Sequence, residues 1–182
     1  MRFALIALAA CVVSPAHAGL VNLSTSDNEF DAGTPNQGWW SENQAGGNNN
    51  TNSSIHTGDL AGVTLRSFFT FDLTAIDSSQ TIQSATLTLP KGGTSTNFSG
   101  TLLLFDVSTA ADVLNDNDDD LTLGPSIYAD LGSGTSYGSL FIDTSTSDPF
   151  AFDLNAAGIA AIQTAVSGGG GFFSIGGRLQ DE

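Results

Sequence analysis

The fold is decided by residues 63–73, which read VTLRSFFTFDL. Apolar side chains recur there at every second position, with a polar break only at Ser67: Val63, Leu65, Phe69, Phe71 and Leu73. The alternate positions form the opposite side of the segment: Arg66, Phe68, Thr70 and Asp72. Because successive side chains of an extended chain point to opposite faces, this pattern predicts a β-strand with one apolar face.

Several other segments predict further strands of similar length. Residues 81–90 repeat the alternation through Ala85, Leu87 and Leu89. Residues 101–107 are apolar at both sets of positions, which is typical of a strand in the middle of a sheet. The remaining predicted strands are 138–143, 150–154 and 171–175, and residues 20–23 provide a candidate first strand.

Helical signals are few. Asn155 is a suitable N-cap for a helix over 156–166, in which Ile159, Ile162 and Val166 share one face. Shorter helical turns are expected from Ser108, as a cap, through Leu114, and over 127–131. Short strands separated by loops rich in Gly, Asn, Asp and Ser predict an all-β fold. We expect an antiparallel, jelly-roll-like β-sandwich with one or two short helices.

The first 18 residues have the three-part layout of a secretory signal peptide. Arg2 supplies the positive charge, residues 3–13 are apolar, and Ala16-His17-Ala18 supplies small residues for cleavage after Ala18. The apolar run is shorter than the roughly 20 residues that span a bilayer, so no membrane span is predicted. A lipoprotein attached through Cys11 is the alternative, because Leu8-Ala9-Ala10-Cys11 resembles a lipidation site.

The chain after the signal peptide divides into two parts. Residues 19–62 are expected to hold the N-terminal strand and a polar Asn/Gly-rich loop, and residues 63–182 the β-sandwich domain. Cys11 is the only cysteine, so no disulfide is expected after cleavage.

The charge balance bears on possible partners. The chain has 19 acidic residues against four Lys and Arg residues. This balance argues against nucleic acid, since phosphate binding requires basic side chains, and against anionic membrane surfaces. It fits a soluble extracellular protein and is compatible with cation binding.

Two neighbouring segments resemble the opening of DNRLRE-type β-sandwich domains: RSFFTFDL at 66–73 and TIQSATLTL at 81–89. Those domains are extracellular bacterial modules, and some of their relatives bind carbohydrate. A closer resemblance is to secreted bacterial proteins with a PEP-type C-terminal sorting tail (PEP-CTERM-like). It rests on LFDVST at 104–109, DLGSGTSYG at 130–138 and GFFSIGG at 171–177. The resemblance implies a secreted, structural β-sandwich and brings no catalytic residues.

The sequence departs from this group at its C-terminal end. Such proteins continue beyond the Gly-Gly-x-Leu segment into another strand, a Pro-Glu-Pro motif, a hydrophobic helix and basic residues, whereas this sequence ends at Gln180-Asp181-Glu182. The resemblance therefore implies either a fragment that lacks the last strand and the sorting tail, or a protein that is released.

The densest acidic segment is a candidate calcium site. Asp116, Asp118 and Asp120 alternate with other polar residues and offer the hard oxygen ligands that Ca²⁺ prefers. The segment matches an EF-hand loop poorly, because Leu121 stands where that loop requires glycine. The alternative is a solvated acidic loop between two strands.

The aromatic pair Trp39-Trp40 is the candidate carbohydrate site. Exposed aromatic side chains can stack on sugar rings and often mark binding surfaces. The alternative, which is favoured because tryptophan buries a large area, is that one or both cover an end of the sandwich as part of the core. The same two interpretations apply to Tyr128 and Tyr137, with the core favoured.

Candidate catalytic groups are weak. Four aspartates fall near predicted strand ends, where a glycosidase pair could form. No spacing along the chain predicts such a pair, and the Phe-Asp-Leu context, which belongs to the family resemblance, suggests structural hydrogen bonds to turn amides instead. The four aspartates are Asp72, Asp106, Asp143 and Asp153. His56 is the sole histidine after cleavage and lies in the polar loop, which is a poor place for a catalytic triad. Arg66 is expected to pair with an aspartate of a neighbouring strand.

These observations predict a secreted, non-catalytic β-sandwich with a structural role in an extracellular matrix or at the cell surface. The alternative is a carbohydrate-binding module with an extracellular polysaccharide as its partner and calcium as its candidate cofactor.

Overall fold

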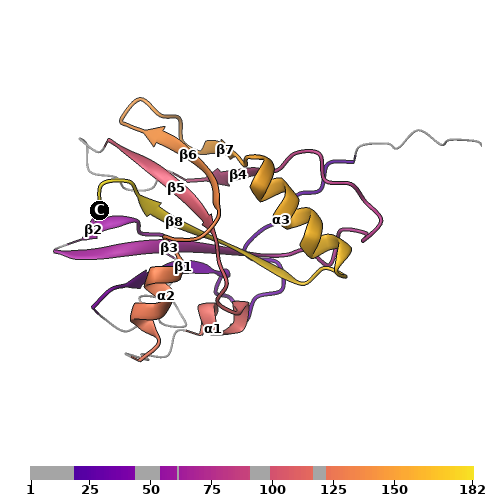
Figure 1. Ribbon diagram of the computed structural model, residues 1–182, viewed down its shortest axis with the longest axis horizontal. Helices are drawn as coiled ribbons and strands as arrows, with labels where there is room; N and C mark the ends of the chain where they lie inside the picture. The colour runs from indigo at the N-terminus through magenta and orange to yellow at the C-terminus, as the bar shows by residue number, and fades with distance from the viewer. Residues whose placement is uncertain (1–18, 44–53, 61, 91–98, 117–121) are drawn as a thin grey trace, which may run out of the picture.

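A computed structural model describes residues 19–43, 54–60, 62–90, 99–116 and 122–182 (Figure 1). The predicted signal peptide, residues 1–18, lies outside the described residues. The described residues form eight strands and three helices. In chain order these are β1 (Gln37–Ser41), β2 (Gly58–Leu60), β3 (Val63–Asp72), β4 (Thr86–Leu89), β5 (Gly100–Asp106), α1 (Ala111–Asn115), α2 (Gly124–Asp130), β6 (Ser136–Ile142), β7 (Phe150–Asp153), α3 (Ala156–Ser167) and β8 (Phe172–Leu179).

The strands form two antiparallel sheets of unequal size. The larger sheet has the order β1-β3-β8-β5-β6, with β2 also paired to β3, and the smaller sheet consists of β4 and β7. This arrangement confirms the predicted all-β antiparallel sandwich, while the jelly-roll connection of its strands stays a prediction. As predicted, β5 is an internal strand, because it pairs with β6 on one side and β8 on the other.

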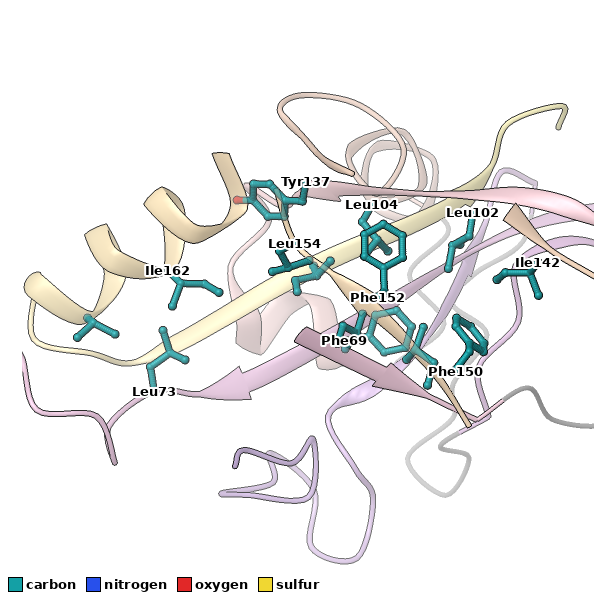
Figure 2. Close-up of a cluster of buried hydrophobic side chains, with 14 residues drawn as sticks. Phe69, Leu73, Leu102, Leu104, Tyr137, Ile142, Phe150, Phe152, Leu154 and Ile162 are labelled. Atoms are coloured by element: carbon teal, nitrogen blue, oxygen red, sulfur yellow. The ribbon is translucent and has the colours of Figure 1, made fainter. Parts of the chain in front are cut away.

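The larger sheet is covered on both faces. On one face the β4–β7 sheet and α3 enclose the larger of two hydrophobic clusters, which includes Phe69, Leu104, Phe152 and Val166. Figure 2 shows Phe69, Leu104 and Phe152 close together in the space between the two sheets. On the other face, α1 and α2 lie over β1 and β3 (Figure 1) and enclose a second cluster. Its buried members are Trp40, Phe68, Leu114, Ile127, Tyr128 and Leu131.

Strand β3 has the predicted alternation, but both of its faces are buried. Phe69 is 1% exposed on the side of β4 and β7, and Phe68 is 0% exposed on the side of α1 and α2. Ser67 interrupts the apolar positions, and its hydroxyl forms a hydrogen bond with the Thr57 hydroxyl at 2.7 Å. The expectation of one apolar face was therefore incomplete, since a single Phe at position 68 did not reveal the helices that cover it.

Helix α2 approaches the centre of the sheet unusually closely at Gly176. A Cβ atom on Gly176 would lie 2.5 Å from the Leu131 carbonyl oxygen and 2.8 Å from the Leu131 Cα. Real side chains do not tolerate such contacts with backbone atoms, so glycine at this position of β8 allows the end of α2 to rest on the sheet.

Helix α3 agrees with its sequence signals. The Asn155 side chain accepts hydrogen bonds from the amides of Ala157 and Gly158, at 2.9 and 3.1 Å, which confirms the predicted N-cap. Gly158 weakens the helix by propensity, yet its buried position lies against Tyr137. A Cβ there would lie 3.2 Å from the Tyr137 ring, so glycine permits close packing of α3 on β6.

Other local predictions require correction. Residues 20–23 form no strand in the structure, and the first strand is β1, inside the segment expected to be loop. Ser108 does not cap α1, because its amide and hydroxyl bind the carboxylate of Asp130 instead. Among the described helices, none is long and apolar enough to cross a membrane.

Replacing Phe68 tests whether the second hydrophobic cluster stabilises the fold. We expect Phe68→Ala to lower the free energy of unfolding by about 3–5 kcal/mol, because it leaves a cavity between β3 and the two helices. Phe141→Ala is the matched control: Phe141 is 60% exposed, so its loss changes stability by about 0.5 kcal/mol or less. Urea denaturation monitored by circular dichroism measures both, and equal effects would contradict this description of the core.

Candidate functional site

The two tryptophans of the candidate carbohydrate site lie on opposite faces of the sheet. They are consecutive residues of β1, so their side chains point in opposite directions. Trp40 is 1% exposed within the cluster beneath α1 and α2, and its Nε1 donates to the Leu114 carbonyl oxygen at 3.1 Å. Trp40 is therefore a core residue, and the pair does not form a shared stacking platform.

Trp39 is half-buried on the other face of β1. The His56 ring meets it edge-on, with ring centroids 6.0 Å apart and an interplanar angle of 82°. The Trp39 Nε1 atom is buried and has no hydrogen-bond partner within the described part of the chain. His56 thus packs against an indole ring, and Trp39 presents only part of its surface to solvent.

Both tyrosines belong to the core, as the sequence favoured. Tyr128 packs in the cluster with Trp40, and Tyr137 packs in the cluster between the sheets. Burial, with a smaller contribution from the charge of Asp106, raises the pKa of Tyr137 to about 12. The phenol of Tyr137 therefore stays protonated at neutral pH and is unsuited to act as a base.

Three of the four strand-end aspartates bind backbone amides of nearby turns. Asp72 accepts from the Thr74 amide at 2.9 Å, Asp106 from the Thr135 amide, and Asp143 from the Ser145 amide at 2.8 Å. The Thr74 amide and hydroxyl hold the pKa of Asp72 below its usual range, and the Ser145 hydroxyl and amide do the same for Asp143. Turn stabilisation is therefore the observed use of these carboxylates.

The fourth strand-end aspartate pairs across the smaller sheet. Asp153 lies opposite Thr86 in the β4–β7 ladder and accepts a hydrogen bond from the Thr86 hydroxyl at 2.7 Å. It forms a polar cross-strand pair at the exposed side of this sheet.

Asp130 is a structural carboxylate that no sequence motif identifies. It accepts four hydrogen bonds, from the amides and hydroxyls of Ser108 and Thr109, at 2.6–3.0 Å. Partial burial acts to raise its pKa, but these hydrogen bonds outweigh burial and hold the pKa below its ordinary value. Asp130 thus ties the end of α2 to the segment between β5 and α1. A local sequence pattern could not reveal this role of Asp130, since its hydrogen-bond partners lie about 20 residues earlier in the chain.

Arg66 pairs with Glu182, and the expected aspartate of a neighbouring strand was wrong. Its Nε donates to the Glu182 carboxylate, whose side chain is only 3% exposed. Its Nη1 donates to the Tyr128 carbonyl at 2.9 Å, and the guanidinium carbon lies 4.0 Å from the centre of the Tyr128 ring. Arg178 likewise donates to the Gly132 carbonyl at 3.1 Å. Both arginines therefore bind carbonyl oxygens at the C-terminal end of α2.

The candidate calcium segment lies largely outside the described residues. Asp118 and Asp120 belong to that part, while Asp116 is exposed just after α1. Within the described ranges, no three His, Cys, Asp or Glu side chains are grouped so as to hold a metal ion. Calcium binding by Asp116, Asp118 and Asp120 stays a prediction.

The structure also reveals a cavity of about 150 Å³ at one side of the sandwich. It lies between β3 and β4 and is bordered by the irregular segment 23–25. The sequence gives no sign of this cavity, because its walls come from five separate parts of the chain.

Comparison with known proteins found no matching family model, no matching curated protein and no matching solved structure. The function is therefore inferred from the residues and their geometry.

Asp130→Asn tests the role of the Asp130 hydrogen bonds. Because the pKa of Asp130 is lowered in the folded state, its ionised form stabilises the fold above the ordinary value of 3.8, and this contribution is lost as pH falls through the folded-state pKa. We expect the variant to lose about 1–2 kcal/mol of unfolding free energy at pH 7, after allowance for partial exposure.

The difference between wild type and Asp130→Asn should shrink as pH falls below 3.8. Urea denaturation at a series of pH values measures it, and the exposed Asp181→Asn variant is the control. A loss of stability in Asp130→Asn that is the same at pH 7 and at the lowest pH of the series would contradict the stabilising role of the ionised Asp130 carboxylate.

Proposed function

We propose that this protein is a secreted, non-catalytic β-sandwich with a structural role in an extracellular matrix or at the cell surface. The observation that carries the proposal is the use of the strand-end carboxylates within the fold. Asp72, Asp106 and Asp143 bind turn amides, and Asp130 binds a neighbouring segment. Each serves as a structural acceptor.

The protonation behaviour of these groups supports a non-catalytic role. Hydrolysis of a glycosidic bond requires one carboxyl group that stays protonated near neutral pH and a second that is ionised. The pKa values of Asp72, Asp130 and Asp143 are all lowered, so all three are ionised acceptors. That is the opposite of the shift that a general acid needs.

Export is supported by the sequence at the start of the chain, where a basic residue, an apolar run and Ala16-His17-Ala18 follow one another. The excess of acidic residues keeps such a protein hydrated outside the cell. Carbohydrate binding is the rival function, and it now depends on Trp39 without Trp40.

Expression of the full chain in a Gram-negative host tests export. We expect the protein to leave the cytoplasm and its N-terminus to be Gly19 by mass spectrometry, because cleavage follows Ala18. A parallel chain that lacks residues 2–18 should stay in the cytoplasm. A lipidated N-terminal Cys11 would support the lipoprotein alternative instead, and an uncleaved cytoplasmic chain would contradict export.

The exported protein is then assayed for binding and hydrolysis of polysaccharides. We expect sedimentation with the insoluble extracellular matrix of producing cells, no turnover of chromogenic glycosides and no retention on a glycan array. Glycan retention that Trp39→Ala abolishes and Phe141→Ala preserves would replace the structural role with carbohydrate binding. Turnover of any glycoside would make the protein an enzyme.

A further inference from the structure

We propose that the cavity between β3 and β4 is a binding site for a small, uncharged ring compound that carries one hydroxyl group, such as a phenol. The site does not depend on the structural role proposed above. Its volume of about 150 Å³ matches the size of a benzene-like ring.

The walls of the cavity combine apolar and polar groups from distant parts of the chain, and seven of the eleven lining residues are apolar. Phe69 and Phe71 project from β3, Leu87 and Leu89 from β4, and Leu23 and Ile55 from the irregular segments beside them. All residues that line the cavity are described, and none of them is ionisable. On a protein with 19 acidic residues, an uncharged lining selects a neutral ligand, because a charged one would lose its hydration without a partner.

One side of the cavity is polar and can orient the ligand. The Thr25 hydroxyl donates to Gln37 Oε1 at 2.8 Å, and both residues border the cavity. A hydroxyl oxygen that donates its proton still has lone pairs with which to accept. The Thr25 oxygen can therefore accept a hydrogen bond from a ligand hydroxyl, while the ring of the ligand contacts the leucine and phenylalanine side chains.

The cavity is partly open to solvent, and the segment that includes Leu23 and Thr25 forms part of its wall. This segment has no regular secondary structure there, and a hydrogen bond from the Asn36 amide to the Thr25 carbonyl, at 2.7 Å, attaches it to the sheet. A ligand can thus enter without separation of the two sheets.

Phenol and toluene are suitable probes, because they have the same number of non-hydrogen atoms and only phenol has a hydroxyl group. We expect saturable changes in the methyl NMR signals of Leu23, Ile55, Leu87 and Leu89, with a dissociation constant for phenol on the order of 1 mM. Toluene should bind about fivefold more weakly, since it lacks the hydrogen bond. Benzoate should not bind, because it is charged.

Three variants separate the site from unspecific binding. Thr25→Val keeps the side-chain volume and should weaken phenol about fivefold while leaving toluene unchanged. Leu23→Trp should fill the cavity and abolish binding of both probes. Leu123→Trp, at an exposed position beside α2, is the matched control and should bind as wild type does.

The methyl spectra also report whether each variant is folded. Absence of saturable shifts in the wild type, or equal shifts in Leu23→Trp, would overturn the proposal. Equal binding of phenol and toluene, unaffected by Thr25→Val, would overturn the role of the hydroxyl group. Benzoate binding as tight as that of phenol would overturn the requirement for a neutral ligand.

Discussion

The burial of two consecutive phenylalanines on β3 is the constraint on which the rest of the structure depends. Phe68 and Phe69 point to opposite faces of the larger sheet, and both are almost completely removed from water. A sheet that is apolar on both faces requires a covering layer on each. The β4–β7 sheet and α3 cover one face, and α1 and α2 cover the other. The fold is therefore a β-sandwich whose outer face carries a third, helical layer over β1 and β3 (Figure 1).

A few polar side chains hold the helical layer of α1 and α2 in place. Short helices such as α1 and α2 are not stable by themselves, so their stability comes from tertiary contacts. Arg66 and Arg178 bind carbonyls at the end of α2, Asp130 joins that end to the segment before α1, and Gly176 lets it rest on β8. The guanidinium of Arg66 also lies over the Tyr128 ring, and this cation–π contact is favourable at a partly desolvated site.

The sequence predicted those parts of the fold that depend on local signals. Period-two alternation located β3 and β4, and Asn155 located the start of α3, because strand alternation and N-caps are encoded within a few residues. The missed features depend on distant partners. The site of Trp40 depends on Leu114, 74 residues later, and that of Arg66 on Glu182, 116 residues later. Strand β1 was hidden in a polar segment for the same reason.

The cavity and the hidden strand have a common physical origin. Residues 19–36 contain few apolar side chains, and the part of this segment beside β4 stays irregular and covers the sheet with Leu23 and Thr25. An irregular segment fills the space over Phe69 and Phe71 less completely than the paired strands β4 and β7 fill the space beside it. A dense core and a ligand-sized cavity can therefore occur on the same face of β3. The small number of apolar side chains in the N-terminal segment determines where the dense packing of the core ends and the cavity begins.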